Sequence, residues 1–418
     1  MKSKKILMAS LVPFWQRRTG AQQRMFALVQ ALQRDGHHIK TFFPMLGVAT
    51  DPDLINKYSL DVEQHTSDEP PDGAFPKAKW YLRAVANRVK ASLPSSDSEP
   101  SNDTTMLKLK DYQWPWTLDA FKQTVSRYQP NIIICQYVTT AWLLEGLSES
   151  QRRDIHCIID THDLLSARNE QFEQHGHGHW IDISRAEESS VLAKFDTVIA
   201  IQASEAATMQ AMAPDARVIV AGYCCGDGEI VQRKISADSS EEKFSLGYIA
   251  SVNASNIDAI EGFLEQAWPR IAKSGPIELV VAGAICETLA KKVDQLNRQT
   301  SGRVRLLGSV DNLIDFYREI DVAINPVQFG TGLKIKTVEA LSYGVPVLTT
   351  EPKIANHKEA QSAAVVYCDS LAELAGKVEW LQTDDEQPFD RLKLKAVEFA
   401  NQGAQAVYQE LLEVIAEA

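Results

Sequence analysis

The sequence predicts two α/β domains of the Rossmann-like type, each with a parallel β-sheet covered by helices. The chain has 418 residues, of which 44% are hydrophobic, and a chain of this length usually divides into more than one core. Apolar runs of strand length alternate with helical patterns, which is typical of a parallel sheet. This alternation stops in a polar stretch at residues 229–242 and then begins again.

The first domain is expected to span residues 1–228. An apolar run at 5–12 predicts its first strand, and Met25, Leu28 and Leu32 then recur at helical spacing until Gly36 ends the helix. Five further apolar runs predict strands at 38–44, 131–137, 154–160, 196–202 and 216–222.

The second domain is expected to span residues 243–395, after a linker at 229–242 that is poor in large apolar side chains. Its predicted strands are 245–251, 277–283, 304–308 and 321–327. Helical patterns separate them at 256–271, 287–298 and 313–320, so the second sheet is also expected to be parallel.

Residues 66–110 depart from this alternation and are interpreted as a mobile insertion in the first domain. Their ends are rich in Pro, Ser and acidic residues, a composition that favours disorder. Between these ends, residues 77–93 form a basic amphipathic pattern around Trp80 and Leu82. Such a helix would suit an anionic membrane surface or a lipid-linked ligand, or would pack on its own domain with a solvated basic face.

Composition excludes several classes of function. The chain has 55 acidic and 43 basic residues and a net charge of −12, which argues against a broad surface for nucleic acid. It has no apolar run of the roughly 20 residues that a membrane span requires. The six cysteines are scattered without metal-ligand spacing, which suits reduced, buried thiols. We expect a cytoplasmic protein, with peripheral contact at the inner face of the membrane as an open alternative.

The segment 325–350 carries the most specific chemical pattern. A predicted strand ends near Asn325, and Gly330 and Gly332 allow a tight turn. A helix follows until Gly344, and Pro346 leads into another strand. Backbone N–H groups of a first helical turn bind anions, and the helix dipole favours negative charge there. Three side chains extend this pattern: the Lys334 and Lys336 cations suit a phosphate, and the Glu339 carboxylate suits neighbouring sugar hydroxyls.

The stretch GTGLKIKTVEALSYGVPV resembles the nucleotide-sugar site of GT-B glycosyltransferases of the family 4 type. The segments NASNIDAIEGFLEQAWPRI and GSVDNLIDFYREIDVAINPV are similar to the second domain of that family, and RRTGAQQR, IIDTHDLLSAR and FDTVIAIQASEA follow its order in the first domain. The resemblance implies the GT-B fold, with two domains facing a cleft and a C-terminal helix, 396–418, that crosses back to the first domain.

The resemblance also implies roles for individual residues. Glu339 would hold the ribose hydroxyls of the donor, and the diphosphate would lie against Gly20 across the cleft. The remaining donor contacts would come from Gly330, Thr331, Gly332, Leu333, Lys334 and Lys336. Thr331 stands where the family commonly has a first glutamate, which leaves recognition of the donor sugar open. Transfer would retain anomeric configuration without a metal ion, in glycan or glycoconjugate biosynthesis.

His162 follows a predicted strand and lies where ligands collect in open α/β sheets. The resemblance places a histidine of this kind near the transferred sugar and the acceptor, so His162, Lys334 and Glu339 are the candidate catalytic residues. Candidate contacts to the acceptor or sugar are Asp163, Arg168, Gln202 and Glu205.

Two other functions stay open from the sequence. A nucleotide-sugar epimerase on the same fold would need additional acid and base carboxylates. A non-catalytic sugar-nucleotide-binding protein is suggested by Thr331 in place of a carboxylate. The alternate histidines at 175, 177 and 179 and the pair Asp51 and Asp53 lack a complete metal-ligand motif. We therefore expect no metal and no cofactor, with the nucleotide sugar as co-substrate and a glycan, lipid-linked or small-molecule acceptor.

Overall fold

The computed structural model describes residues 3–44, 51–65, 107–176, 180–224, 230–231, 243–299, 303–310, 312–327, 333, 335–350, 364–383 and 387–418. The basic segment 77–93 lies outside these residues, as does most of the insertion expected at 66–110. Among the helices described, none has the length and apolar character needed to cross a membrane.

The first domain is built on a parallel sheet in the order β3-β2-β1-β5-β6-β8-β9 among the described residues. Its strands are β1 (Lys5–Ala9), β2 (His38–Phe43), β3 (Asp61–Gln64), β5 (Ile132–Gln136), β6 (His156–Asp160), β8 (Thr197–Ala200) and β9 (Arg217–Val220). Its α-helices are α1 (Gly20–Arg34), α2 (Pro52–Lys57), α4 (Pro115–Tyr128), α5 (Glu149–Asp154), α6 (Leu165–Gln174), α7 (Arg185–Leu192) and α8 (Ala203–Met212).

Shorter elements complete this domain. They are the 3-10 helices η1 (Phe14–Gln16), η2 (Leu109–Tyr112) and η3 (Val138–Gly146), and the strands β4 (Leu107–Lys108) and β7 (Ile181–Asp182). The strands β4 and β7 pair in a separate two-stranded parallel sheet.

Alternation along β1 explains how its sheet is covered on both faces. Leu7 and Ala9 belong to one buried cluster, whereas Ile6 and Met8 belong to another. Successive side chains of a strand point to opposite faces, so an uninterrupted apolar run is required where helices cover both faces.

Among the predicted strands, 154–160 differs most from the structure at its start. The strand predicted at 154–160 begins at His156, because residues 149–154 form α5. The Ser148 hydroxyl accepts a hydrogen bond from the Gln151 backbone N–H and so caps this short helix.

The second domain has a parallel sheet in the order β12-β11-β10-β13-β14-β15 among the described residues. Its strands are β10 (Phe244–Ile249), β11 (Ile277–Ala282), β12 (Arg303–Gly308), β13 (Val322–Asn325), β14 (Val347–Thr349) and β15 (Val365–Tyr367). Its helices are α9 (Ala254–Gln266), α10 (Trp268–Ser274), α11 (Ile285–Gln299), α12 (Leu313–Tyr317), α13 (Ile335–Ser342) and α15 (Leu371–Leu381).

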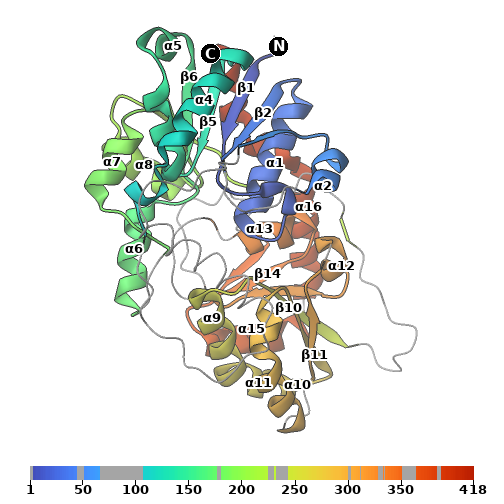
Figure 1. Cartoon of the computed structure of the whole chain (residues 1–418). Coiled ribbons are helices and arrows are strands. Elements are labelled where there is room, and N and C mark those ends of the chain that lie inside the picture. The colour runs from blue at the N-terminus through green and yellow to red at the C-terminus, as the bar shows by residue number, and fades with distance from the viewer. Residues whose placement is uncertain are drawn as a thin grey trace.

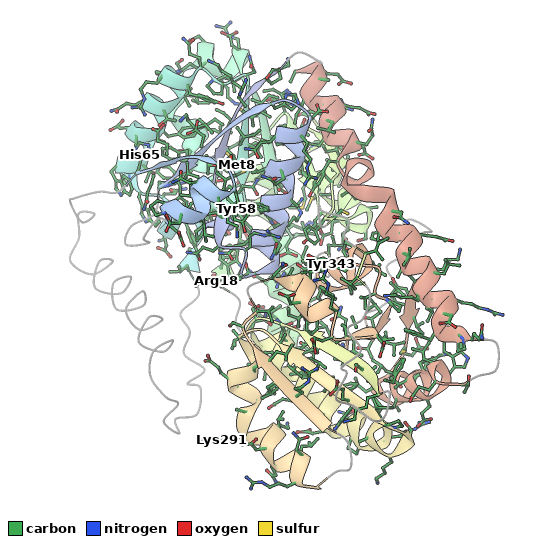
Figure 2. The ribbon with its side chains drawn as sticks, turned by 90° about the vertical axis from the view of Figure 1, so that its right-hand side faces the viewer. Met8, Arg18, Tyr58, His65, Lys291 and Tyr343 are labelled. Atoms are coloured by element: carbon green, nitrogen blue, oxygen red, sulfur yellow. The ribbon has the colours of Figure 1, made fainter. Side chains whose placement is uncertain are left out.

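Two C-terminal helices connect the domains. Helix α16 (Pro388–Val407) contacts α13 and α15 in the second domain, and α17 (Gln409–Glu417) contacts β9 in the first. Figure 2 shows this red segment running along both domains, and Figure 1 shows the two termini together in the upper domain. The side chains Leu411, Val414 and Ile415 are buried in the core of the first domain. The predicted crossing of the chain back to the first domain is therefore confirmed, and position 396 lies within α16.

Candidate active site between the domains

The domains meet where the N-terminal ends of α1 and α13 converge, one above the other in Figure 1. A Cβ atom added to Gly20 would lie 3.1 Å from the Ile335 Cβ atom, closer than ordinary van der Waals contact. A Cβ atom on Gly222 would lie 3.7 Å from a Leu333 methyl carbon. Gly20 therefore lets α1 and α13 approach closely at this junction, near the strand ends where open α/β sheets bind ligands.

Glu339 lies on α13 and is 6% exposed. Its Oε1 atom accepts a hydrogen bond of 3.3 Å from the Tyr223 hydroxyl, which belongs to the end of the first domain. Burial raises the pKa of Glu339 to about 7, against the opposing effects of the Tyr223 hydrogen bond and the charges of Lys336 and Arg17. The carboxylate is therefore partly protonated near neutral pH and is held between the two domains.

Lys336 extends from α13 toward the first βα turn of the second domain. Its Nζ atom donates a hydrogen bond of 2.7 Å to Asn256 Oδ1 and lies 4.7 Å from the centroid of the Tyr248 ring. Asn256 is in the first turn of α9, which the Asn253 side chain caps by accepting from the Asn256 backbone N–H. The Lys336 cation thus lies beside a helix N-terminus, where both contribute positive potential.

Only one of the remaining predicted donor residues lies in the described part of the chain. Gly330, Thr331, Gly332 and Lys334 lie outside the described residues, whereas Leu333 is described and contacts the Gly222 region. The described part of the predicted phosphate turn therefore consists of Leu333 and the helix that begins at Ile335.

His162 lies at the carboxyl end of β6 and is 4% exposed. Its Nε2 atom lies 2.6 Å from Gln136 Oε1 and 3.7 Å from Asp160 Oδ2. Two acceptor oxygens near Nε2 favour the tautomer that carries its proton there. Burial lowers the pKa of His162 to about 3, with Asp160 opposing this shift. At neutral pH, His162 is therefore an uncharged imidazole held in one orientation.

The backbone at His162 and at Tyr137 is in the left-handed region, with φ of 63° at both residues. Bulky residues rarely adopt this conformation, and such strain concentrates at functional sites. The two rings stack with centroids 4.1 Å apart. The adjacent strands β5 and β6 are therefore each followed by a residue with strained backbone, and the rings of these two residues stack on each other.

Arg24 connects this end of the sheet to the domain junction. It is 1% exposed, and its Nη1 atom donates to Asp160 Oδ2 at 2.5 Å. Its Nη2 and Nε atoms donate to the backbone carbonyls of Ala221 and Gly222 at 2.8 and 3.1 Å. The charge of Arg24 holds the pKa of the Asp160 carboxyl below its usual range despite burial. Breaking such a pair would leave a buried charge uncompensated.

The four predicted acceptor contacts take different positions. Arg168 donates to Asp163 Oδ2 at 2.6 Å, so these two residues, near the start of α6, engage each other. Gln202 and Glu205 follow β8, the neighbour of β6 in the sheet, and Glu205 is 6% exposed in the first turn of α8. The strand order thus brings all four to the same edge of the sheet as His162.

Sequence reasoning missed several residues that shape this site: Arg24, Gln136, Tyr137, Tyr223 and Asn256. Arg24 had a recognisable signal, because a basic side chain stands among apolar residues on the predicted helix next to Met25 and one turn before Leu28. The other residues follow strands or begin helices, where polar or aromatic identity alone does not show which way a side chain points.

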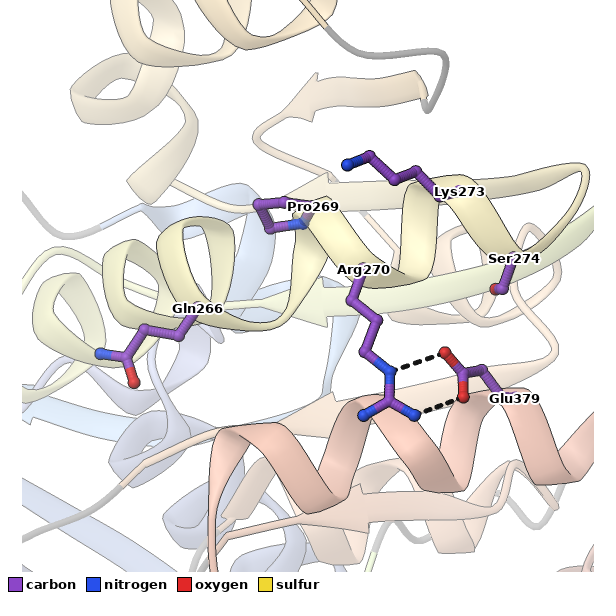
Figure 3. Close-up of a pocket in the computed structure, with 6 residues that line it drawn as sticks. All are labelled: Gln266, Pro269, Arg270, Lys273, Ser274 and Glu379. Atoms are coloured by element: carbon purple, nitrogen blue, oxygen red, sulfur yellow. Dashed lines mark hydrogen bonds and ion pairs between the residues drawn. The ribbon is translucent and has the colours of Figure 1, made fainter.

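Two open surface hollows of about 500 Å³ lie among the described residues, outside the domain junction. One, shown in Figure 3, is lined by Gln266, Pro269, Arg270, Lys273, Ser274 and Glu379. There Arg270 donates to both carboxylate oxygens of Glu379 at 2.8 and 2.5 Å. The other is lined by Lys40, Glu63, His65, Thr124, Arg127 and Tyr128. In both, cationic side chains already pair with carboxylates of the protein.

Comparison with protein families identifies the class of this protein. A family model of group 1 glycosyl transferases matches residues 243–384, and a model of the glycosyl transferase 4-like domain matches residues 19–224. The two matches follow the two domains in order and together span most of the chain. The chain is therefore a glycosyltransferase with two Rossmann-like domains. Its second domain matches the group 1 glycosyl transferases and its first domain the glycosyl transferase 4-like domain. The predicted enzyme class is therefore confirmed.

Solved structures share the whole fold at low sequence identity. Sucrose-phosphate synthase from Thermosynechococcus elongatus is 14% identical, with a TM-score of 0.66 over 99% of this chain and 98% of its own. Anabaena HepE in complex with UDP and glucose is 14% identical, with a TM-score of 0.65 over 99% and 100%. S. aureus TarM, in a complex with fondaparinux, α-GlcNAc-glycerol and UDP, is 11% identical, with a TM-score of 0.63 over 98% and 99%. The predicted GT-B fold is thus confirmed. No curated protein sequence matches the chain.

Proposed function

We propose that this protein transfers a sugar from a nucleotide-diphosphate sugar to an acceptor hydroxyl, with retention of configuration and without a metal ion. The observation that carries the proposal is the buried Glu339 carboxylate at the domain junction, on the helix that follows the glycine turn. The neighbours HepE and TarM were solved with UDP, which supports a nucleotide donor.

The second domain would hold the donor. The Glu339 carboxylate accepts hydrogen bonds from the ribose hydroxyls, in competition with the Tyr223 hydroxyl that it now binds. As the family resemblance implies, the diphosphate would be bound by backbone N–H groups at Gly330, Gly332 and Leu333, together with Lys334 and Lys336. Positive charge at this point stabilises the leaving diphosphate as the glycosidic bond breaks. These cations take the place that a metal ion has in other transferases.

The first domain would hold the acceptor near His162. Because the His162 imidazole is uncharged at neutral pH, it exchanges hydrogen bonds with sugar hydroxyls and adds no positive charge. The bond to Gln136 and the nearby Asp160 occupy its Nε2 side, so Nδ1 is the atom that would accept a hydrogen bond. His162 would thus orient the transferred sugar or the acceptor hydroxyl.

Calorimetry tests the donor site before any acceptor is known. UDP, GDP, ADP, CMP and their common sugar conjugates are titrated into the protein with and without EDTA. We expect one nucleotide diphosphate to bind equally well in both conditions. Glu339→Ala should weaken that binding by about 1–3 kcal/mol, because it removes an acceptor of one or two hydrogen bonds.

The matched control is Glu379→Ala, which removes a carboxylate paired with Arg270 on the outer surface of the second domain. It should bind the nucleotide as the wild type does. Unchanged affinity in Glu339→Ala would remove Glu339 from the donor site, and dependence on a metal would show as loss of binding or turnover with EDTA. Turnover with inverted product configuration, read by NMR of the anomeric proton, would contradict retention.

A further inference from the structure

A series of aromatic side chains in contact leads outward from His162. The Tyr137 ring, stacked on His162, meets the Trp180 indole edge to face with centroids 5.8 Å apart and planes at 84°. Trp180 in turn meets the Tyr112 ring at 6.0 Å and 89°. The rings therefore form a continuous path from a buried imidazole to the surface.

Trp180 is 43% exposed and is one of the few large apolar side chains so exposed in the described part of the chain. Its position is set by the small sheet of β4 and β7, in which Leu107 pairs with Ile181. This pairing brings η2, which ends at Tyr112, beside the residue that precedes β7. A separate sheet and two edge-to-face contacts thus hold an exposed indole in a defined orientation.

Charged groups border the same rings. The charges of Asp163 and Arg168 act on the Tyr137 phenol, and these two residues pair at 2.6 Å near the start of α6. The carboxylate and the guanidinium act on Tyr137, the ring that Trp180 contacts on its inner side. An exposed indole with polar groups further in matches a sugar ring, which has an apolar C–H face and hydroxyl groups at its rim. An alkyl chain would leave these charges desolvated and unpaired with the ligand.

We propose that Trp180, held by Tyr112 and Tyr137, is the acceptor subsite and stacks on the ring of a carbohydrate acceptor. This inference rests on the proposed function, which places the acceptor beside His162. It identifies the acceptor as a glycan or glycoside and Trp180 as the residue that selects it.

Binding of simple glycosides tests the subsite without knowledge of the natural acceptor. Methyl α- and β-glycosides of glucose, galactose and N-acetylglucosamine are titrated into the full chain and followed by saturation-transfer NMR. We expect at least one to bind to the wild type, and Trp180→Ala to raise its Kd about tenfold through loss of the aromatic contact. Trp180→Phe, which keeps a flat ring, should stay within about threefold of the wild type, whereas Trp180→Leu should resemble Trp180→Ala.

The chain offers a matched control in Trp380, which is 41% exposed on α15 of the second domain. Trp380→Ala should bind the glycosides as the wild type does. Equal affinity in Trp180→Ala, or no binding of any glycoside to the wild type, would overturn the proposal. So would binding that appears only with long-chain alkyl glycosides, because the surface would then take a lipid tail.

Donor hydrolysis, measured on the same variants without acceptor, separates this proposal from the proposed function. Trp380→Ala should hydrolyse the nucleotide sugar at the wild-type rate, since Trp380 lies on α15 of the second domain. A wild type that neither binds nor hydrolyses a nucleotide sugar contradicts the proposed function itself. Intact hydrolysis with unchanged glycoside binding in Trp180→Ala contradicts only the role of Trp180.

Discussion

At the scale of single residues, burial sets the protonation of the two candidate groups Glu339 and His162. It raises the pKa of Glu339 to about 7 and lowers the pKa of His162 to about 3. Both shifts favour the uncharged form, as desolvation requires. A bound ribose would favour the Glu339 carboxylate, whereas His162 is already in the form in which it would act.

The His162 shift makes a prediction about stability and pH. Between pH 6.5 and about 3, the unfolded chain protonates this imidazole and the folded chain does not. The free energy of unfolding must therefore fall as the pH is lowered through this window, with a slope approaching roughly 1.4 kcal/mol per pH unit from this residue. His162→Asn removes the titrating group, and asparagine tolerates a φ of 63°.

Urea unfolding at several pH values between 4 and 7 measures this effect. The wild type should lose stability more steeply than His162→Asn as the pH falls. The control is His175→Asn, which replaces an exposed imidazole at the end of α6 and should keep the wild-type slope. Parallel curves for the wild type and His162→Asn would show that His162 does not stay neutral in the folded state.

Motif and position in the sequence led to Glu339 and His162 as candidate site residues, and their roles stay predictions. Sequence reasoning missed Arg24, whose three donors bind Asp160 and two carbonyls nearly 200 residues away in the chain. Asp160 lies at the end of β6, and the two carbonyls follow β9. Arg24 therefore meets its partners only when these strands are assembled in the sheet. Long-range partners of this kind depend on the fold, so a single sequence shows the unusual residue but not its contacts.

At the scale of elements, the contact between α1 and α13 sets the separation of the domains at the site. Gly20 leaves no room for a Cβ atom beside Ile335. Gly20→Ala should therefore push the helices apart by a few tenths of an ångström and lower donor turnover severalfold, since small displacements at a reacting site are costly. The fold should persist, because alanine is a good helix former.

A double-mutant cycle measures this steric effect. Ile335→Gly removes the facing Cβ atom and both of its branches. Gly20→Ala combined with Ile335→Gly should therefore recover part of the turnover lost in Gly20→Ala alone. Purely additive losses in the double variant would mean that the approach of the two helices does not control activity. Thermal unfolding of each variant checks that the fold is intact.

The strands were the elements best predicted from the sequence. Buried strands such as β5 and β6 are nearly continuous apolar runs, which is the pattern that a sheet covered on both faces requires. The edge strands β3 and β15 and the two-residue strands β4 and β7 escaped prediction. Their pairing depends on neighbours far away in the chain, and their short sequences carry no periodicity of their own.

At the scale of the whole molecule, the C-terminal helices couple the folding of the two domains. Helix α17 follows the second domain in sequence but is part of the core of the first. Two polar contacts add to this packing: Arg217 pairs with Glu417 at 2.5 Å, and the Val220 N–H donates to Glu410 at 2.9 Å. The crossing was predicted from the family resemblance, because an amphipathic terminal helix alone does not indicate which domain it covers.

This arrangement predicts that damage to α17 destabilises the distant first domain. Leu411 is fully buried among side chains of that domain, so Leu411→Ala should cost about 2–5 kcal/mol of unfolding free energy. Differential scanning calorimetry should show a transition shifted to lower temperature, with the first domain unfolding ahead of the second. Leu394→Ala, at a 58% exposed position on α16, should change stability by less than about 0.5 kcal/mol. Equal, small effects of the two substitutions would mean that α17 does not belong to the core of the first domain. A nucleotide that binds at the junction should raise both transitions in the wild type, because it stabilises only the state in which the two domains are folded and in contact.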